Sequence, residues 1–240
     1  MAAVVYPLFC LLKRRPMSAH YKSLARRTNP DTIAIFPLNG TVLLPACDLP
    51  LNIFEPRYLN MVDDALKKDR LIGLIQTDES GILSIGSLGR ITQFSETEDG
   101  RYVIVLKGLK RFKILSEAST TTPYRQANVS FDDFQSDAEV HDLTLMPEAL
   151  TDIGGNERSS LTLAMKSLAK ALGVNVDWNS LAEIPLPNLV DQASMISPFK
   201  PVDKQSLLEA SNYEERRRLL IGLMHLYASS GRGENEQPIQ

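Results

Sequence analysis

Apolar and polar positions change their spacing within one stretch, IAIFPLNGTVLLPACDLPLNIFEPRY, which covers residues 33–58. Its first run alternates as a β-strand does and ends at Phe36-Pro37, because proline cannot donate to a sheet ladder. Short extended pieces follow at 42–44 and 49–54, and their prolines suit strand edges and bends. After Glu55 the spacing becomes helical, with Pro56 at the first helical position. The pattern predicts curling strands that lead into an amphipathic helix.

Further strand-like runs continue to residue 131. They cover 70–77, 82–85, 88–94, 101–106, 112–115 and 124–131. Gly86-Ser87 separates one pair of runs, Glu98-Asp99-Gly100 gives a hairpin signal, and Gly108–Arg111 separates another pair. This order predicts an antiparallel meander in which all three glycine segments are turns.

The last third of the chain has helical spacing instead. Helices are predicted over 158–172, 180–184, 189–197 and 203–210, followed by a long one that ends near Tyr227. Ser211-Asn212 is the predicted cap of this last helix, with Glu214 or Glu215 at the capping-box position.

These changes of pattern divide the chain into five segments. We expect a disordered extension over 1–30, a β subdomain over 31–134, an acidic linker over 135–156, a helical subdomain over 157–229 and a disordered tail over 230–240. The extension carries six Lys and Arg and no acidic residue, and we interpret it as a disordered segment that includes an upstream start codon, with Met17 as the actual start. The alternative is an organellar transit peptide, which would place the protein in a mitochondrion or plastid.

Composition narrows the classes of protein. A chain of 240 residues with 43% hydrophobic content can bury one large core or two modest ones. It contains no apolar run of about 18 residues, so no transmembrane helix is predicted. Two cysteines cannot build a disulfide framework, which favours a reducing compartment such as the cytoplasm. Beyond the extension, 20 Lys and Arg face 29 Asp and Glu, so the core is acidic.

Several motifs resemble one known family. The segments FPL, LPLNIFEPRY and RLIGLI, followed by GSLGRI, VLKGLKRFKI and KQSLLEASNYEERRRLLIGLM, resemble the N-terminal substrate-recognition domain of the ATP-dependent Lon proteases in a stand-alone form. The resemblance implies an α+β fold: a PUA-like mixed β pseudo-barrel with one packed helix, followed by a helical subdomain. Lon ATPase and protease activities reside in domains that a chain of this length does not include.

Candidate catalytic motifs are incomplete. The segment 81–88 has two glycines at P-loop spacing but lacks the lysine, and Ser167 with Lys170 matches S-x-x-K without its partner motifs. The three histidines and two cysteines form no cluster at metal-ligand spacing. We therefore predict a protein that is not an enzyme and has no cofactor or metal.

Two binding hypotheses remain. In the first, which the resemblance implies, the chain binds unfolded or tagged polypeptide segments and acts in protein quality control, as an adaptor for full-length Lon or its competitor. Residues at the strand-to-helix junction would rim the groove: Asn52, Phe54, Glu55, Arg57 and Tyr58. In the alternative, a PUA-like module binds RNA through Lys107, Lys110, Arg111 and Lys113. The acidic core opposes this alternative, so nucleic acid is not the expected partner.

Overall fold

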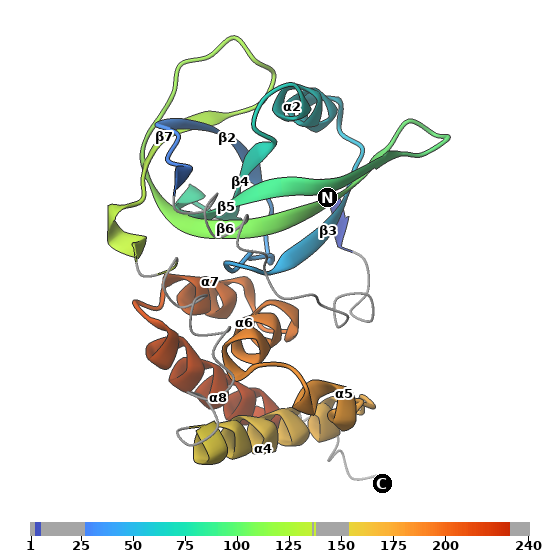
Figure 1. The fold of residues 1–240 in the computed structure, drawn as a ribbon, viewed down its shortest axis with the longest axis vertical. Helices are drawn as coiled ribbons and strands as arrows, with labels where there is room; N and C mark the ends of the chain where they lie inside the picture. The colour runs from blue at the N-terminus through green and yellow to red at the C-terminus, as the bar shows by residue number, and fades with distance from the viewer. Residues whose placement is uncertain (1–2, 6–26, 136, 138–153, 231–240) are drawn as a thin grey trace, which may run out of the picture. The chain divides into compact units, whose positions relative to one another are not determined.

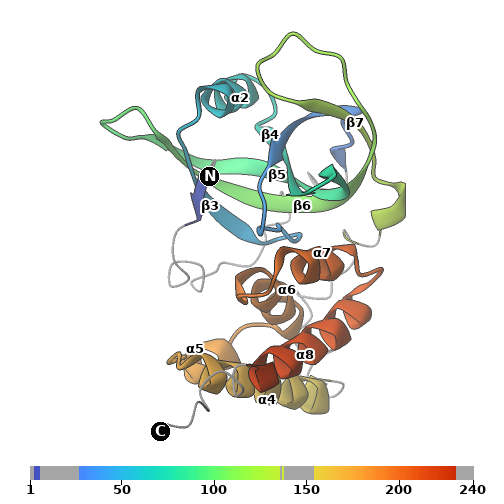
Figure 2. The ribbon, with the colours of Figure 1, turned by 180° about the vertical axis from the view of Figure 1, so that it is seen from behind.

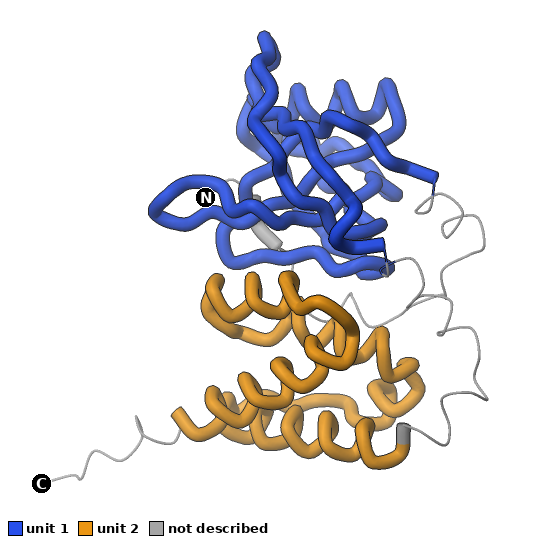
Figure 3. The backbone as a smooth tube through the Cα atoms, turned by 90° about the vertical axis from the view of Figure 1, so that its left-hand side faces the viewer, with its two compact units in different colours: residues 1–141 blue, residues 142–240 orange. Residues whose placement is uncertain are grey.

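The computed structural model describes residues 3–5, 27–135, 137 and 154–230. The chain divides into two compact units, residues 1–141 and residues 142–240 (Figure 3). Most of the predicted linker, the proposed start at Met17 and the residues 231–240 lie outside the described residues. The first unit is a mixed β pseudo-barrel with one packed helix and the second is helical, which confirms the predicted α+β class.

The first unit is built on a seven-stranded sheet (Figure 1). Its strands are β1 (Ala3–Val5), β2 (Thr32–Pro37), β3 (Asp48–Ile53), β4 (Leu71–Asp78), β5 (Gly81–Glu96), β6 (Tyr102–Glu117) and β7 (Gln126–Ser130), and a 3₁₀ turn, η2, covers Asp132–Phe134. The strand order is β1-β3-β6-β5-β4-β2-β7, and an additional β6–β7 pairing closes the barrel. The pairing of β2 with β4 is parallel and the others are antiparallel. The predicted meander is thus interrupted by one parallel pair.

Helix α2 (Pro56–Leu66) packs on the barrel (Figure 2). Proline occupies its first turn, as predicted, where its missing N–H costs nothing. Tyr58, Met61, Val62 and Ala65 are buried at helical spacing, which confirms the amphipathic pattern.

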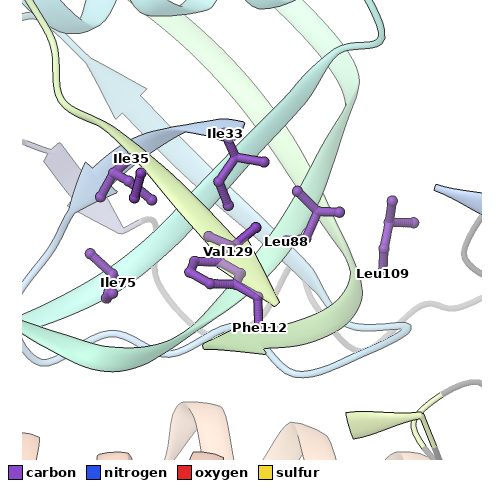
Figure 4. Close-up of a cluster of buried hydrophobic side chains, with 8 residues drawn as sticks. Ile33, Ile35, Ile75, Leu88, Leu109, Phe112 and Val129 are labelled. Atoms are coloured by element: carbon purple, nitrogen blue, oxygen red, sulfur yellow. The ribbon is translucent and has the colours of Figure 1, made fainter. Parts of the chain in front are cut away.

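The barrel interior is filled by aliphatic side chains around one aromatic ring (Figure 4). Its buried members are Ile33, Ile35, Ile75, Leu88, Leu109, Phe112, Ala127 and Val129. They come from β2, β4, β5, β6 and β7, so the core requires the closed pairing.

Two predicted turns are wrong. Strands β5 and β6 each run without interruption through Gly86 and Gly108. A Cβ at Gly86 would lie 2.6 Å from the Leu74 carbonyl oxygen, and one at Gly108 would lie 2.2 Å from that of Leu44. These glycines permit close backbone approach within long strands, which is the other common reason for glycine in a sheet.

Two further differences concern extended segments. Residues 42–44 are buried but form no strand, although an extended piece was predicted there. Conversely, Ala3–Val5, inside the predicted disordered extension, form strand β1 against β3.

The second unit contains five helices among its described residues. They are α4 (Gly154–Leu172), α5 (Trp178–Ala182), α6 (Leu186–Ile196), α7 (Pro201–Glu209) and α8 (Tyr213–Ser230). The side chain of Asn212 accepts a hydrogen bond from the Glu215 amide at 3.0 Å, and the Glu215 carboxylate accepts from the Ser211 amide at 2.7 Å. The predicted cap of the last helix is therefore present, with Glu215 as its acidic member.

Candidate functional site

The strand-to-helix junction holds its arginine on the surface. Glu55 is the N-cap of α2 but its side chain makes no capping hydrogen bond. Instead its Oε2 accepts from Arg57, at 2.9 Å from Nε and 2.6 Å from Nη2. This hydrogen bond is the main reason that the pKa of Arg57 is raised. Because 55% of the Arg57 side chain is exposed, the pair orients the guanidinium at little energetic cost.

The ring of Tyr58 packs against this arginine. Its ring is buried and meets Phe36 edge to face, with centroids 4.6 Å apart. The guanidinium carbon of Arg57 lies 4.8 Å from the centroid of the Tyr58 ring, within cation–π range. Burial raises the pKa of Tyr58. Tyr58 is thus a core side chain whose ring also contacts the guanidinium of Arg57.

A small cavity opens beside this pair. It has a volume of about 250 Å³ and is lined by Pro37, Arg57, Tyr58, Pro123, Tyr124 and Arg125. We call it the arginine cavity. The side chain of Arg125 is 53% exposed, and its Nη1 lies 3.8 Å from Glu117 Oε1. Two half-exposed guanidiniums and two tyrosine rings therefore converge on one hollow.

Tyr124 fixes the loop that delivers Arg125. Its hydroxyl donates to Asp64 Oδ2 of α2 at 2.9 Å. Burial, and then this hydrogen bond, raise the pKa of Tyr124 to about 12. The backbone carbonyl of Arg125 accepts a hydrogen bond from the Ile35 amide of β2 at 2.8 Å. The wall formed by residues 123–125 is thereby tied to both α2 and β2.

The predicted junction residues separate into two places. Arg57 and Tyr58 line the arginine cavity, and Glu55 orients Arg57. Asn52 is 5% exposed within β3, whereas Phe54 is 38% exposed. Neither Asn52 nor Phe54 lines the cavity.

Sequence reasoning missed the other half of the lining. Pro123-Tyr124-Arg125 contains the same three residue types as Pro56-Arg57-Tyr58, and this duplication was the available signal. Nothing local in the sequence indicates that the two segments meet, because a long-range contact creates the cavity.

The four cations of the RNA alternative are engaged within the protein. Lys107 Nζ lies 3.0 Å from Asp48 Oδ1, and Lys113 Nζ lies 3.3 Å from Asp133 Oδ2. Arg111 is 1% exposed and pairs with Asp137 at 2.7 Å, its guanidinium stacked on Phe134. Lys110 is buried over the Phe131 ring and donates to Asn29, and burial lowers its pKa to about 8. A phosphate-binding surface needs several exposed cations, and of these four only Lys113 is half exposed, so this arrangement does not support RNA binding.

A larger cavity, of about 580 Å³, lies on the same unit. Its lining includes Lys110, Phe131, Asp132 and Phe134. Asp132 accepts from the Ser130 hydroxyl at 2.9 Å, and Lys110 donates to Asn29, so these polar groups already have partners. The arginine cavity instead gathers two exposed side chains of the same charge, Arg57 and Arg125, and is the better candidate site.

The incomplete sequence motifs lie within regular secondary structure. The segment with P-loop-like glycine spacing, 81–88, lies within β5, and Ser167 and Lys170 lie on α4. Among the described residues, no group of three or more His, Cys, Asp or Glu side chains could hold a metal ion. None of the described helices combines the length and apolar character that a membrane crossing requires.

Known proteins resemble this chain over most of its length. The family model of the ATP-dependent protease La (LON) substrate-binding domain matches residues 32–225. Lon protease 2 of Sorangium cellulosum is 28% identical over 208 residues, which are 81% of this chain and 24% of that protein. Lon protease of Escherichia coli K12 is 25% identical, over 82% of this chain and 25% of that protein. The chain therefore spans about a quarter of the length of these curated relatives.

Solved structures agree on the fold. The Lon N-terminal domain protein from Xanthomonas campestris has a TM-score of 0.53 at 23% identity, covering 80% of this chain and 97% of that chain. The N-terminal domain of Mycobacterium avium complex Lon protease has a TM-score of 0.58 at 19% identity, covering 81% of this chain and 98% of that one. Because the family model matches well over half of its residues, the chain belongs to the LON substrate-binding domain family.

Proposed function

We propose that this chain is a non-enzymatic module that binds unfolded or tagged polypeptide segments through the arginine cavity. The observation that carries the proposal is the convergence of Arg57 and Arg125 on one aromatic-lined hollow, in a chain of the LON substrate-binding domain family. The match to the family model is to the substrate-binding domain, and the match to Lon protease 2 covers 24% of that protein, so the ATPase and protease activities are not carried over.

The chemistry of the cavity favours acidic and aromatic side chains. A guanidinium donates two parallel hydrogen bonds to a carboxylate, which lysine cannot do. Tyr58, Tyr124 and the prolines supply apolar surface for the remainder of a side chain. A ligand carboxylate would exchange with Glu55, which already occupies one edge of Arg57. We therefore expect weak, salt-sensitive binding of acidic unfolded segments.

The wider role follows from this binding. A chain that binds polypeptide segments without degrading them would either compete with full-length Lon for substrates or deliver them, and we propose competition. Two cysteines and no disulfide framework suit a cytoplasmic location.

Fluorescein-labelled casein, an unfolded and acidic protein, tests the binding. We expect Arg57→Ala and Arg125→Ala each to raise the dissociation constant for casein by about tenfold, the range expected for the loss of one charged hydrogen bond. Fluorescence anisotropy at low and high salt measures it. Arg101→Ala is the matched control, because Arg101 also pairs with an acid two residues earlier, Asp99, at 2.7 Å on an exposed hairpin.

The outcomes separate clearly. Wild-type affinity in the Arg101 variant with weak binding in the two cavity variants supports the proposal. Equal affinity in all variants, or no binding of casein by the wild-type chain, overturns it.

A further inference from the structure

Strand β3 has two edges, and a segment from far away in the sequence covers one of them. On its inner edge, Asp48–Ile53 pair with Tyr102–Lys107 of β6. On its outer edge, Leu51, Asn52 and Ile53 pair antiparallel with Val5, Val4 and Ala3 of β1. Figure 1 shows β1 as a short strand beside β3. The pairing joins residues more than 40 positions apart through backbone groups.

Only part of the outer edge of β3 offers both a backbone donor and a backbone acceptor for pairing with another strand. Val105, the β6 partner of Pro50, directs its carbonyl to the Thr92 hydroxyl of β5 at 3.1 Å and hence away from β3. Backbone groups of neighbouring residues in a strand point to opposite edges, so those of Pro50 and Asn52 point outward. Pro50 has no N–H to offer there. Within Pro50–Ile53, Asn52 therefore provides both a donor and an acceptor at this edge, and it is opposite Val4.

The surroundings of Asn52 suit a ligand strand. Its side chain is 5% exposed, yet its Oδ1 accepts no hydrogen bond from any described residue. A buried acceptor without a donor is costly, and an incoming polar group would relieve that cost. Phe54, two residues farther along, is 38% exposed and offers apolar surface at the end of the same edge.

We propose that the outer edge of β3 at Leu51–Ile53 is an acceptor for an extended apolar polypeptide segment, which residues 3–5 occupy in the free chain. Strand addition recognises the backbone of its ligand, so it tolerates many sequences, as an acceptor of unfolded chains must. The inference rests on the proposed function and specifies a second mode of contact, separate from the arginine cavity. A three-residue strand forms few backbone bonds, so a longer segment can displace it.

The probe is a labelled peptide with the sequence of residues 1–8, MAAVVYPL. It is titrated against the full-length chain carrying Val4→Pro, which removes the N–H that faces Asn52 and opens the edge. We expect this variant to bind the peptide about tenfold more tightly than the wild type, because the internal strand competes at high effective concentration. Val4→Thr is the control, since threonine keeps both the N–H and the β preference. It should bind as the wild type does.

A second probe tests the backbone hydrogen bond itself. The same peptide with an N-methyl group on its Val4 cannot donate to the edge, and we expect it to show no gain with Val4→Pro. Hydrogen exchange provides an independent readout: the Asn52 amide should lose protection in Val4→Pro and regain it with the unmodified peptide. Equal binding of the two peptides, or equal affinity of Val4→Pro and wild type, overturns the proposal.

Casein binding distinguishes this inference from the proposed function. A wild-type chain that binds casein, with no gain for Val4→Pro, refutes the acceptor edge and leaves the arginine cavity supported. A gain for Val4→Pro without casein binding supports the edge and refutes the cavity as a polypeptide site.

Discussion

Arg111 is a cation that the barrel uses for its own construction. It is 1% exposed, and its Nε and Nη2 lie 3.0 and 2.7 Å from the oxygens of Asp137, whose Oδ2 also accepts the Arg111 amide. Phe134 covers the guanidinium at 4.3 Å from the ring centroid. A carboxylate from beyond the last strand thereby anchors the chain to β6.

Removing this arginine should destabilise the folded protein strongly. We expect Arg111→Met to lower the free energy of unfolding by about 3–5 kcal/mol, because it leaves Asp137 buried without its counter-ion. The measurement is chemical denaturation followed by circular dichroism. Lys113→Met is the control: its pair with Asp133 is about half exposed on both sides, and its loss should cost less than about 1 kcal/mol. Similar costs for the two variants would show that the Arg111 pair contributes no more than a surface pair.

The same residues show why sequence reasoning misjudged the basic cluster. Lys107, Lys110, Arg111 and Lys113 are close in sequence, which suggested a charged surface. Their partners come from Asp48, Asn29, Asp137 and Asp133, up to 81 residues away. Charge clusters are visible in a sequence, whereas long-range pairing depends on the fold.

Among the elements, the long strands β5 and β6 take part in most of the strand pairings of the barrel. Along β6, pairing passes from β3 at Asp48↔Lys107 to β7 at Lys113↔Ser130. Gly108 lies at this change of partner, and its amide donates to the Cys47 carbonyl at 2.8 Å. The absence of a Cβ allows the segment before β3 to lie directly on β6.

A methyl group at this position should destabilise the barrel. In Gly108→Ala the new Cβ would lie 2.2 Å from the backbone oxygen of Leu44, which cannot rotate away as a side chain can. We expect a loss of about 1–3 kcal/mol in unfolding free energy, the usual range for overpacking. Gly222→Ala on the exposed face of α8 is the control, because a Cβ there meets nothing within 4 Å. It should raise stability by about 1 kcal/mol through helix propensity. A tolerated Gly108→Ala would show that the contact is not rigid.

Local signals predicted the elements better than their pairing. Pro56 at the start of α2 and the cap at Asn212 are short-range features, and both predicted helix starts are present. The parallel pairing of β2 with β4 and the closure of β6 on β7 are not encoded by any local motif. The turns predicted at Gly86 and Gly108 are wrong, because glycine is used both in turns and where two backbone segments approach closely.

For the whole molecule, the sequence identified half of the candidate site. Arg57 and Tyr58 were predicted from the junction after β3, whereas Arg125 and Tyr124 enter from the loop before β7. The candidate site and the β3 edge both belong to the first unit. Binding of polypeptide can therefore be tested by substitutions in that unit alone.

At the scale of the whole molecule, the proposed competition with a Lon protease can be measured directly. In a reaction of Escherichia coli Lon, ATP and labelled casein below saturation, we expect the wild-type chain to slow peptide release. At a concentration equal to its casein dissociation constant, it should sequester about half of the casein and reduce the rate about twofold. The chain carrying both Arg57→Ala and Arg125→Ala should have little effect, and Arg101→Ala should inhibit as the wild type does. Faster release would indicate delivery of substrate instead of competition, and an unchanged rate despite measured casein binding would show that the two proteins recognise different segments.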